Sequence, residues 1–127
     1  MKHVLVAEDD EPTRSFLIEA LTDEGYVVIA AADGKTALER CAETKPDLVV
    51  LDLSMPLMKG FEFLRRRGRD CSAPVIAMSA AFRMGELAGL SVAAFLAKPY
   101  DLRVLIAVIA RSLGPAIDEG PSERPLN

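Results

Sequence analysis

Residues 48–52 have the sequence LVVLD, and this stretch decides the fold class of the chain. Four apolar residues, Leu48 to Leu51, follow one another without alternating with polar ones. Such a run is typical of a strand that is covered on both faces, as at the centre of a parallel sheet. Asp52 then ends the run with a carboxylate. The stretch therefore predicts a parallel α/β sheet whose central strand ends in an acidic residue.

Four more short apolar segments lie on either side of this strand, separated by turns and amphipathic stretches. The predicted strands are residues 3–7, 26–31, 74–78 and 93–97. A helix begins near Pro12, which suits a first helical turn, and ends at Gly25. Its apolar positions are Phe16, Leu17, Ala20 and Leu21.

A second and a third helix are predicted before the fourth strand, and another helix follows the last strand. Asp33 and Gly34 form the turn into the second helix, whose inner face carries Ala37, Leu38, Cys41 and Ala42. The third covers residues 61–67 and the last covers residues 101–113. Strands that alternate with helices over short connections predict a three-layer, doubly wound, five-stranded parallel sheet.

The domain organisation follows from length and composition. The chain has 127 residues, the usual size of one domain. Residues 114–127, GPAIDEGPSERPLN, contain three prolines and four charged residues and cannot bury enough surface to offset their ordering entropy. We therefore predict one domain over residues 1–113 and a flexible tail or linker stub over residues 114–127.

Composition excludes several classes of protein. No apolar run approaches the roughly 20 residues of a membrane-spanning helix, and Met1-Lys2-His3 leads into a strand without a secretory h-region. A net charge of −4 gives no reason to expect direct DNA binding. Cys41 is expected in the core and Cys71 as an exposed loop thiol, both reduced. These features predict a cytoplasmic protein with no membrane partner.

Polar residues follow four of the five predicted strands. Glu8 and Asp9 follow the first strand, Asp52 the third, Ser79 the fourth and Lys98 the fifth. In an open parallel sheet these positions meet at one edge. Each has an ordinary explanation by itself, as a solvated turn, an Asx turn, a helix cap or a surface lysine. Together, however, the clustered carboxylates would repel one another unless a cation neutralised them.

The combination of residue types at this edge suits phosphoryl chemistry. Carboxylate ligands with open water positions favour Mg²⁺. A carboxylate such as Asp52 can attack a phosphoryl group and form an aspartyl-phosphate. The Lys98 ammonium and the Ser79 hydroxyl can then offset the charge of the phosphoryl oxygens. The sequence thus predicts a magnesium-dependent phosphoacceptor site.

Four separated motifs carry a family resemblance. They are AEDDEPTR at residues 7–14, LDLSMPLMKG at 51–60, MSA at 78–80 and FLAKPY at 95–100. In this order they resemble the receiver domain of bacterial two-component response regulators, and the resemblance covers roughly residues 3–113. It implies a flavodoxin-like, CheY-like sheet with strand order 2-1-3-4-5.

The resemblance also implies roles for single residues. Asp52 matches the phosphoacceptor and Lys98 the phosphate-binding lysine, with a cis peptide bond to Pro99. Metal ligands would be Asp9 directly, Glu8 through water, Asp52 itself, and the backbone carbonyl of Ser54. The switch residues would be Ser79 and Phe95, the latter without the hydroxyl of a tyrosine.

The implied function is a phosphorylation-activated signalling switch of a two-component system or phosphorelay. A histidine kinase or phosphotransfer protein would phosphorylate Asp52, and a downstream protein would bind the phosphorylated form. The binding face would combine a helix expected between Ser79 and Ala93, strand 93–97 and helix 101–113. The segment between Ser79 and Lys98 is shorter than is usual in the family, which predicts a short or mobile helix there. The chain would not be an enzyme beyond self-catalysed phosphotransfer and autodephosphorylation.

Three alternatives remain open at this point. The chain could be an excised receiver domain of a larger regulator. It could be a magnesium-dependent phosphatase similar to the haloacid dehalogenases, although that class needs an acid two residues after the nucleophile, where Ser54 stands. It could also be an interaction module that works without phosphorylation.

Overall fold

The computed structural model describes residues 1–54, 60–67, 71–80 and 92–113. Strands and helices alternate along residues 3–79, as the apolar pattern predicted, and one more strand and one more helix follow within residues 94–113. In chain order they are β1 (His3–Ala7), α1 (Glu11–Asp23), β2 (Val27–Ala31), α2 (Gly34–Thr44), β3 (Leu48–Asp52), α3 (Gly60–Arg66), β4 (Val75–Ser79), β5 (Ala94–Ala97) and α4 (Leu102–Leu113).

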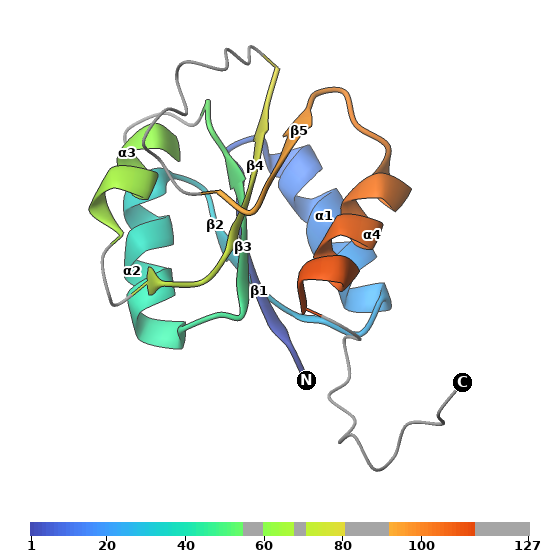
Figure 1. Ribbon diagram of the computed structural model, residues 1–127, viewed down its shortest axis with the longest axis horizontal. Helices are drawn as coiled ribbons and strands as arrows, with labels where there is room; N and C mark the ends of the chain where they lie inside the picture. The colour runs from blue at the N-terminus through green and yellow to red at the C-terminus, as the bar shows by residue number, and fades with distance from the viewer. Residues whose placement is uncertain (55–59, 68–70, 81–91, 114–127) are drawn as a thin grey trace.

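The strands form one five-stranded sheet in the order β2-β1-β3-β4-β5, and every neighbouring pair is parallel. Helices α2 and α3 cover one face of this sheet, and α1 and α4 cover the other (Figure 1). The predicted fold class and strand order are therefore confirmed. Strand β3 is central and all five of its residues are buried, which explains its uninterrupted apolar sequence.

Two apolar clusters fill the spaces between the sheet and its helices. Side chains of a strand alternate between faces, so Val49 and Leu51 enter the cluster under α2 and α3, whereas Leu48 and Val50 enter the one under α1 and α4. The three inner strands β1, β3 and β4 contribute residues to both clusters. The two layers of core hold the strand ends in fixed positions at the edges of the sheet.

Local sequence signals account for both ends of α1 and for the start of α2. Asp10 caps α1 by accepting a hydrogen bond from the Thr13 N–H at 3.1 Å, and Asp33 caps α2 through the Thr36 N–H at 2.7 Å. Gly25, at φ 97°, follows α1 as predicted. Lys45 ends α2 at φ 47°, a left-handed conformation that nothing in its sequence context predicted.

Phe16, one of the four apolar positions predicted for the first helix, is not part of the core. Leu17 and Leu21 are fully buried against the sheet, whereas Phe16 is 55% exposed. Adjacent helical residues point in different directions, so only one residue of the pair Phe16 and Leu17 can face the strands. The sequence offers two apolar candidates, and packing selects Leu17.

The prediction of two reduced cysteines is also wrong, because Cys41 and Cys71 form a disulfide with a Cα–Cα distance of 5.3 Å. Cys71 is only 4% exposed, so it is not the exposed loop thiol that was expected. Cys41 lies on the inner face of α2, and Cys71 lies just before β4 in the same apolar cluster. The fold brings together two residues that are 30 positions apart.

Two sequence predictions fall outside the described residues. The helix expected between Ser79 and Ala93 would occupy residues 81–91, and the tail would occupy residues 114–127. Within the described part of the chain, no helix is both long and apolar enough to cross a membrane.

Candidate functional site

The carboxyl ends of four strands bring the predicted site residues to one edge of the sheet. Asp52 at the end of β3 pairs with Met78, and Ser79 at the end of β4 pairs with Ala97. The Lys98 N–H donates to the Ser79 carbonyl at 2.9 Å, which continues the β5 register by one residue. The parallel register therefore places Asp52, Ser79 and Lys98 on adjacent strand ends.

Three carboxylates converge at this edge. One oxygen each from Glu8, Asp9 and Asp52 lies within 4.8 Å of the others. Glu8 is completely buried and Asp52 is 3% exposed, whereas Asp9 faces solvent. Like charges so close together, two of them away from water, are unfavourable unless cations offset them.

Lys98 supplies one such cation. Its Nζ atom lies 3.2 Å from Oε1 of Glu8 and 3.3 Å from Oδ2 of Asp52. The side chain is 27% exposed, so the ammonium sits at the boundary between the buried carboxylates and solvent. One lysine thus bridges the two buried acids. The peptide bond between Lys98 and Pro99 is cis, as the family resemblance implied.

The electrostatics of the cluster appear in two pKa shifts. Burial, followed by the hydrogen bond and the charge of Asp52, raises the pKa of Glu8 to about 7. Burial alone would lower the pKa of Lys98, but the carboxylates of Asp52 and Glu8 outweigh it and raise that pKa. Lys98 therefore keeps its positive charge near neutral pH, while the raised pKa favours the protonated form of Glu8.

Backbone donors orient the two buried carboxylates. The Ser54 N–H donates to Oδ1 of Asp52 at 2.9 Å, and the Asp10 N–H donates to Oε2 of Glu8 at 3.3 Å. Each acid thus has one oxygen on a backbone amide and the other on Lys98. The role of the Ser54 carbonyl as a metal ligand remains a prediction.

Ser79 and Phe95 lie on the same face of the sheet, on neighbouring strands. Ala77 pairs with Phe95 and shares the α2 and α3 side of the core with it. Ser79 is two residues beyond Ala77 and so points to that same face. Ser79 is 4% exposed and Phe95 is half-buried. The structure therefore places the two predicted switch residues diagonally across one strand pair.

The donor set fits Mg²⁺. All candidate ligands are oxygen atoms, and Glu8, Asp9 and Asp52 reach one small region from two strands. Oxygen-only sites with solvent access suit a hard cation that keeps several water ligands, and the exposed position of Asp9 supplies that access. The carboxylates of these three residues, with the Ser54 carbonyl, are the groups that would hold the ion.

A hollow of about 430 Å³ opens beside Lys98, between the start of α1 and the segment after β5. Its lining residues are Thr13, Phe16, Ala80, Lys98, Pro99, Tyr100 and Leu102. Sequence analysis assigned no site role to Phe16 or Tyr100. The only signal was the adjacency of Tyr100 to the Lys98-Pro99 pair, since the exposure of Phe16 depends on packing.

Sequence analysis also missed Arg14. Its guanidinium Nη1 donates to the backbone carbonyls of Glu8 at 2.9 Å and Asp9 at 3.3 Å. In the sequence, Arg14 is one polar residue among several on its helix. Only the turn between β1 and α1 brings it back to the acidic pair.

Comparisons with known proteins agree with this geometry. The family model of the response regulator receiver domain matches residues 4–110. The response regulator MprA of Mycobacterium sp. strain KMS is 38% identical over 125 residues, covering 93% of this chain and 54% of the relative. The transcriptional regulatory protein CseB of Streptomyces avermitilis is 36% identical over 129 residues, covering 97% of this chain and 54% of the relative. The chain thus spans about half the length of these curated relatives.

Solved structures show the same fold. The chemotaxis protein CheY4 of Vibrio cholerae superposes with a TM-score of 0.80 at 28% identity, covering 89% of this chain and 99% of that one. A CheY-like receiver domain protein from Methanospirillum hungatei superposes with a TM-score of 0.84 at 23% identity, covering 89% and 94%. With the family match over most of its length, the chain belongs to the family of response regulator receiver domains.

Proposed function

We propose that Asp52 accepts a phosphoryl group and that this receiver domain thereby works as a signalling switch. The observation that carries the proposal is the Lys98 ammonium, 3.3 Å from Asp52 and 3.2 Å from Glu8. It places a fixed positive charge where a phosphoryl group on Asp52 would need one. Membership of the receiver family supports the same assignment, and the phosphatase alternative loses its basis.

The chemistry is a transfer between a donor and a carboxylate. An oxygen of Asp52 attacks phosphorus, a P–O bond forms as the P–N bond of a phosphohistidine breaks, and the donor imidazole leaves with the bonding pair and takes up a proton. Lys98 and the Ser79 hydroxyl donate hydrogen bonds to the phosphoryl oxygens. Mg²⁺, held by Glu8, Asp9 and Asp52, would supply charge neutralisation at the transferred group. The chain acts only on itself in this scheme and needs no enzymatic activity toward other substrates.

The proposed switch runs from the site through one strand pair to the surface. A hydrogen bond from Ser79 to the phosphoryl group would move its side chain and change the space open to Phe95, on the same face of the sheet. The phosphoryl group can favour one arrangement only by interacting with it more strongly.

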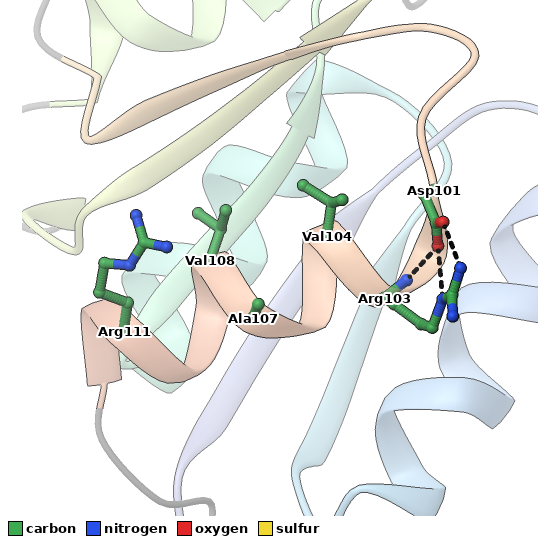
Figure 2. Close-up of a pocket in the computed structure, with 6 residues that line it drawn as sticks. All are labelled: Asp101, Arg103, Val104, Ala107, Val108 and Arg111. Atoms are coloured by element: carbon green, nitrogen blue, oxygen red, sulfur yellow. Dashed lines mark hydrogen bonds and ion pairs between the residues drawn. The ribbon is translucent and has the colours of Figure 1, made fainter.

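The proposed partner surface includes β5 and the outer face of α4. Figure 2 shows this face of α4, where Asp101 bonds to Arg103 and the row continues through Val104, Ala107, Val108 and Arg111. Val104 is 46% exposed. An exposed apolar residue between charged ones is suited to a protein partner. The third predicted part of the face lies outside the described residues.

The remaining assignments complete the proposal. The receiver domain occupies residues 1–113, followed by a tail over residues 114–127. A histidine kinase or phosphotransfer protein is the donor and a downstream protein is the output partner, without direct DNA binding by this domain. The cytoplasm is the proposed location because ATP-dependent kinases supply phosphoryl groups there, although disulfides such as Cys41–Cys71 are rare in that compartment.

Incubation with acetyl phosphate, followed by intact-mass spectrometry, tests the proposal. With Mg²⁺ the protein should gain one phosphate, and without Mg²⁺ or in Asp52→Asn it should gain none. Asp23→Asn, at an exposed position of α1, serves as the matched control and should label normally. Labelling of Asp52→Asn at the rate of the unmodified protein would contradict the assignment.

A further inference from the structure

We propose that Arg14 is a positioning residue for the divalent-cation site, because it holds the backbone of the turn that carries Glu8 and Asp9. The inference rests on the proposed magnesium-dependent function and adds a residue to it. Arg14 bonds to main-chain carbonyls, and within the described part of the chain no hydrogen bond or ion pair joins it to a carboxylate of the cluster.

The contacts of Arg14 clamp the turn from the side of the helix. Nη1 donates to the carbonyl of Glu8 at 2.9 Å and to that of Asp9 at 3.3 Å. Its backbone N–H donates to the Asp10 carbonyl at 2.8 Å. Two consecutive carbonyls, those of Glu8 and Asp9, therefore accept hydrogen bonds from the Arg14 side chain, whereas the bond to Asp10 is the ordinary i to i−4 bond of the helix and does not depend on the side chain. With these peptide groups fixed, the directions in which Glu8 and Asp9 leave the backbone are fixed as well.

Asp9 depends on this clamp more than the other acids do. Glu8 is held by the Asp10 N–H and Lys98, and Asp52 is held by the Ser54 N–H and Lys98. Among the described residues, no donor bonds to the Asp9 carboxylate. As far as the described residues go, the backbone that Arg14 contacts therefore sets the place of the Asp9 carboxylate within 4.8 Å of the other two.

A positioning role of Arg14 and a purely electrostatic effect of its charge predict opposite changes in Mg²⁺ affinity when Arg14 is replaced. Removing a positive charge near an acidic cluster should by itself strengthen the binding of a cation. Loss of a residue that orients a metal ligand should weaken it, by roughly tenfold as for other outer residues of metal sites. The sign of the change in Mg²⁺ affinity therefore separates the two effects.

Calorimetric titration with Mg²⁺ alone, without a phosphodonor, measures this sign. Arg14→Gln should bind Mg²⁺ roughly tenfold more weakly than the unmodified protein. Arg14→Lys keeps the charge but has one ammonium instead of a planar donor group, and should show a smaller loss. Asp9→Asn is the positive control, and Arg40→Gln, at an exposed position of α2, is the matched control that should change nothing.

A second measurement separates positioning from a general loss of structure. The rate of labelling of Arg14→Gln by acetyl phosphate should return to that of the unmodified protein when Mg²⁺ is raised to saturation, whereas damage to the fold would lower the rate at all concentrations. If Arg14→Gln does not fold, Arg14→Lys decides by the same titration. Equal or tighter Mg²⁺ binding by the variants would overturn the inference alone. Failure of the unmodified protein to bind Mg²⁺ would overturn the proposed function and this inference with it.

Discussion

The Nζ atom of Lys98 lies 3.3 Å from Oδ2 of Asp52, although 46 residues separate the two in the chain. The same ammonium also bonds to Glu8, so one partly buried lysine offsets two buried carboxylates. The stability of the metal-free site and the proposed chemistry thus both depend on Lys98.

Lys98→Met should destabilise the metal-free protein at pH 8, where two buried carboxylates would remain without their cation. We expect the free energy of unfolding to fall by about 1 to 3 kcal/mol, less than for a fully buried pair because part of Lys98 reaches solvent. Phosphorylation of Asp52 should slow by about 100-fold. Urea unfolding and acetyl phosphate labelling measure the two effects, with Lys35→Met, at an exposed position of α2, as control. Unchanged labelling would show that Lys98 has no role in the transfer.

Glu8 should make the stability of the metal-free protein depend on pH. Its pKa is about 7 in the folded protein, above the ordinary value of 4.5. Between these pKa values the folded state binds more protons than the unfolded state, so this contribution to stability is full below pH 4.5 and is lost as the pH rises through 7. From pH 5 to pH 8, the free energy of unfolding measured with urea should fall more for the unmodified protein than for Glu8→Gln. Parallel pH profiles of the two proteins would contradict the raised pKa.

Reduction of the Cys41–Cys71 disulfide should lower the free energy of unfolding by about 2 to 4 kcal/mol, because the cross-link restricts the unfolded chain. The labelling rate of Asp52 should stay the same, since Cys71 precedes β4 whereas the site lies beyond the other ends of the strands. Urea unfolding with and without a phosphine reductant tests the first point, with thiol titration to verify the redox state. Equal unfolding midpoints in both states would contradict it.

Ser79→Ala should uncouple Phe95 from the site. In the unmodified protein, Mg²⁺ with beryllium fluoride, a mimic of the phosphoryl group, should shift the ring resonances of Phe95. In Ser79→Ala these shifts should be largely lost, because no hydroxyl is present to move toward the mimic. Ser72→Ala, at an exposed position before β4, is the matched control. Full shifts in Ser79→Ala would mean that Phe95 responds through another route.

The sequence determined by itself which residues form strands, because apolar periodicity is a local property that follows the backbone geometry. Residues 3–7 were predicted with the observed bounds. The strands at 27–31, 48–52 and 94–97 differ from prediction by one residue at one end, and the strand at 75–79 is shifted by one residue. The sequence also predicted that Glu8, Asp52, Ser79 and Lys98 lie at one edge of the sheet, because the carboxyl ends of parallel strands lie at the same edge.

Only the tertiary structure decided which of these groups touch. Strand register and the choice of the helix face that packs inward decide four features. These are the bonds of Lys98 to Glu8 and Asp52, the contact of Arg14 with two carbonyls, the Cys41–Cys71 disulfide and the exposure of Phe16. Spacing along the chain carries no information on such distances. These distances are set when the helices pack on the sheet and form the two apolar clusters, since dense packing leaves each side chain only one place to lie.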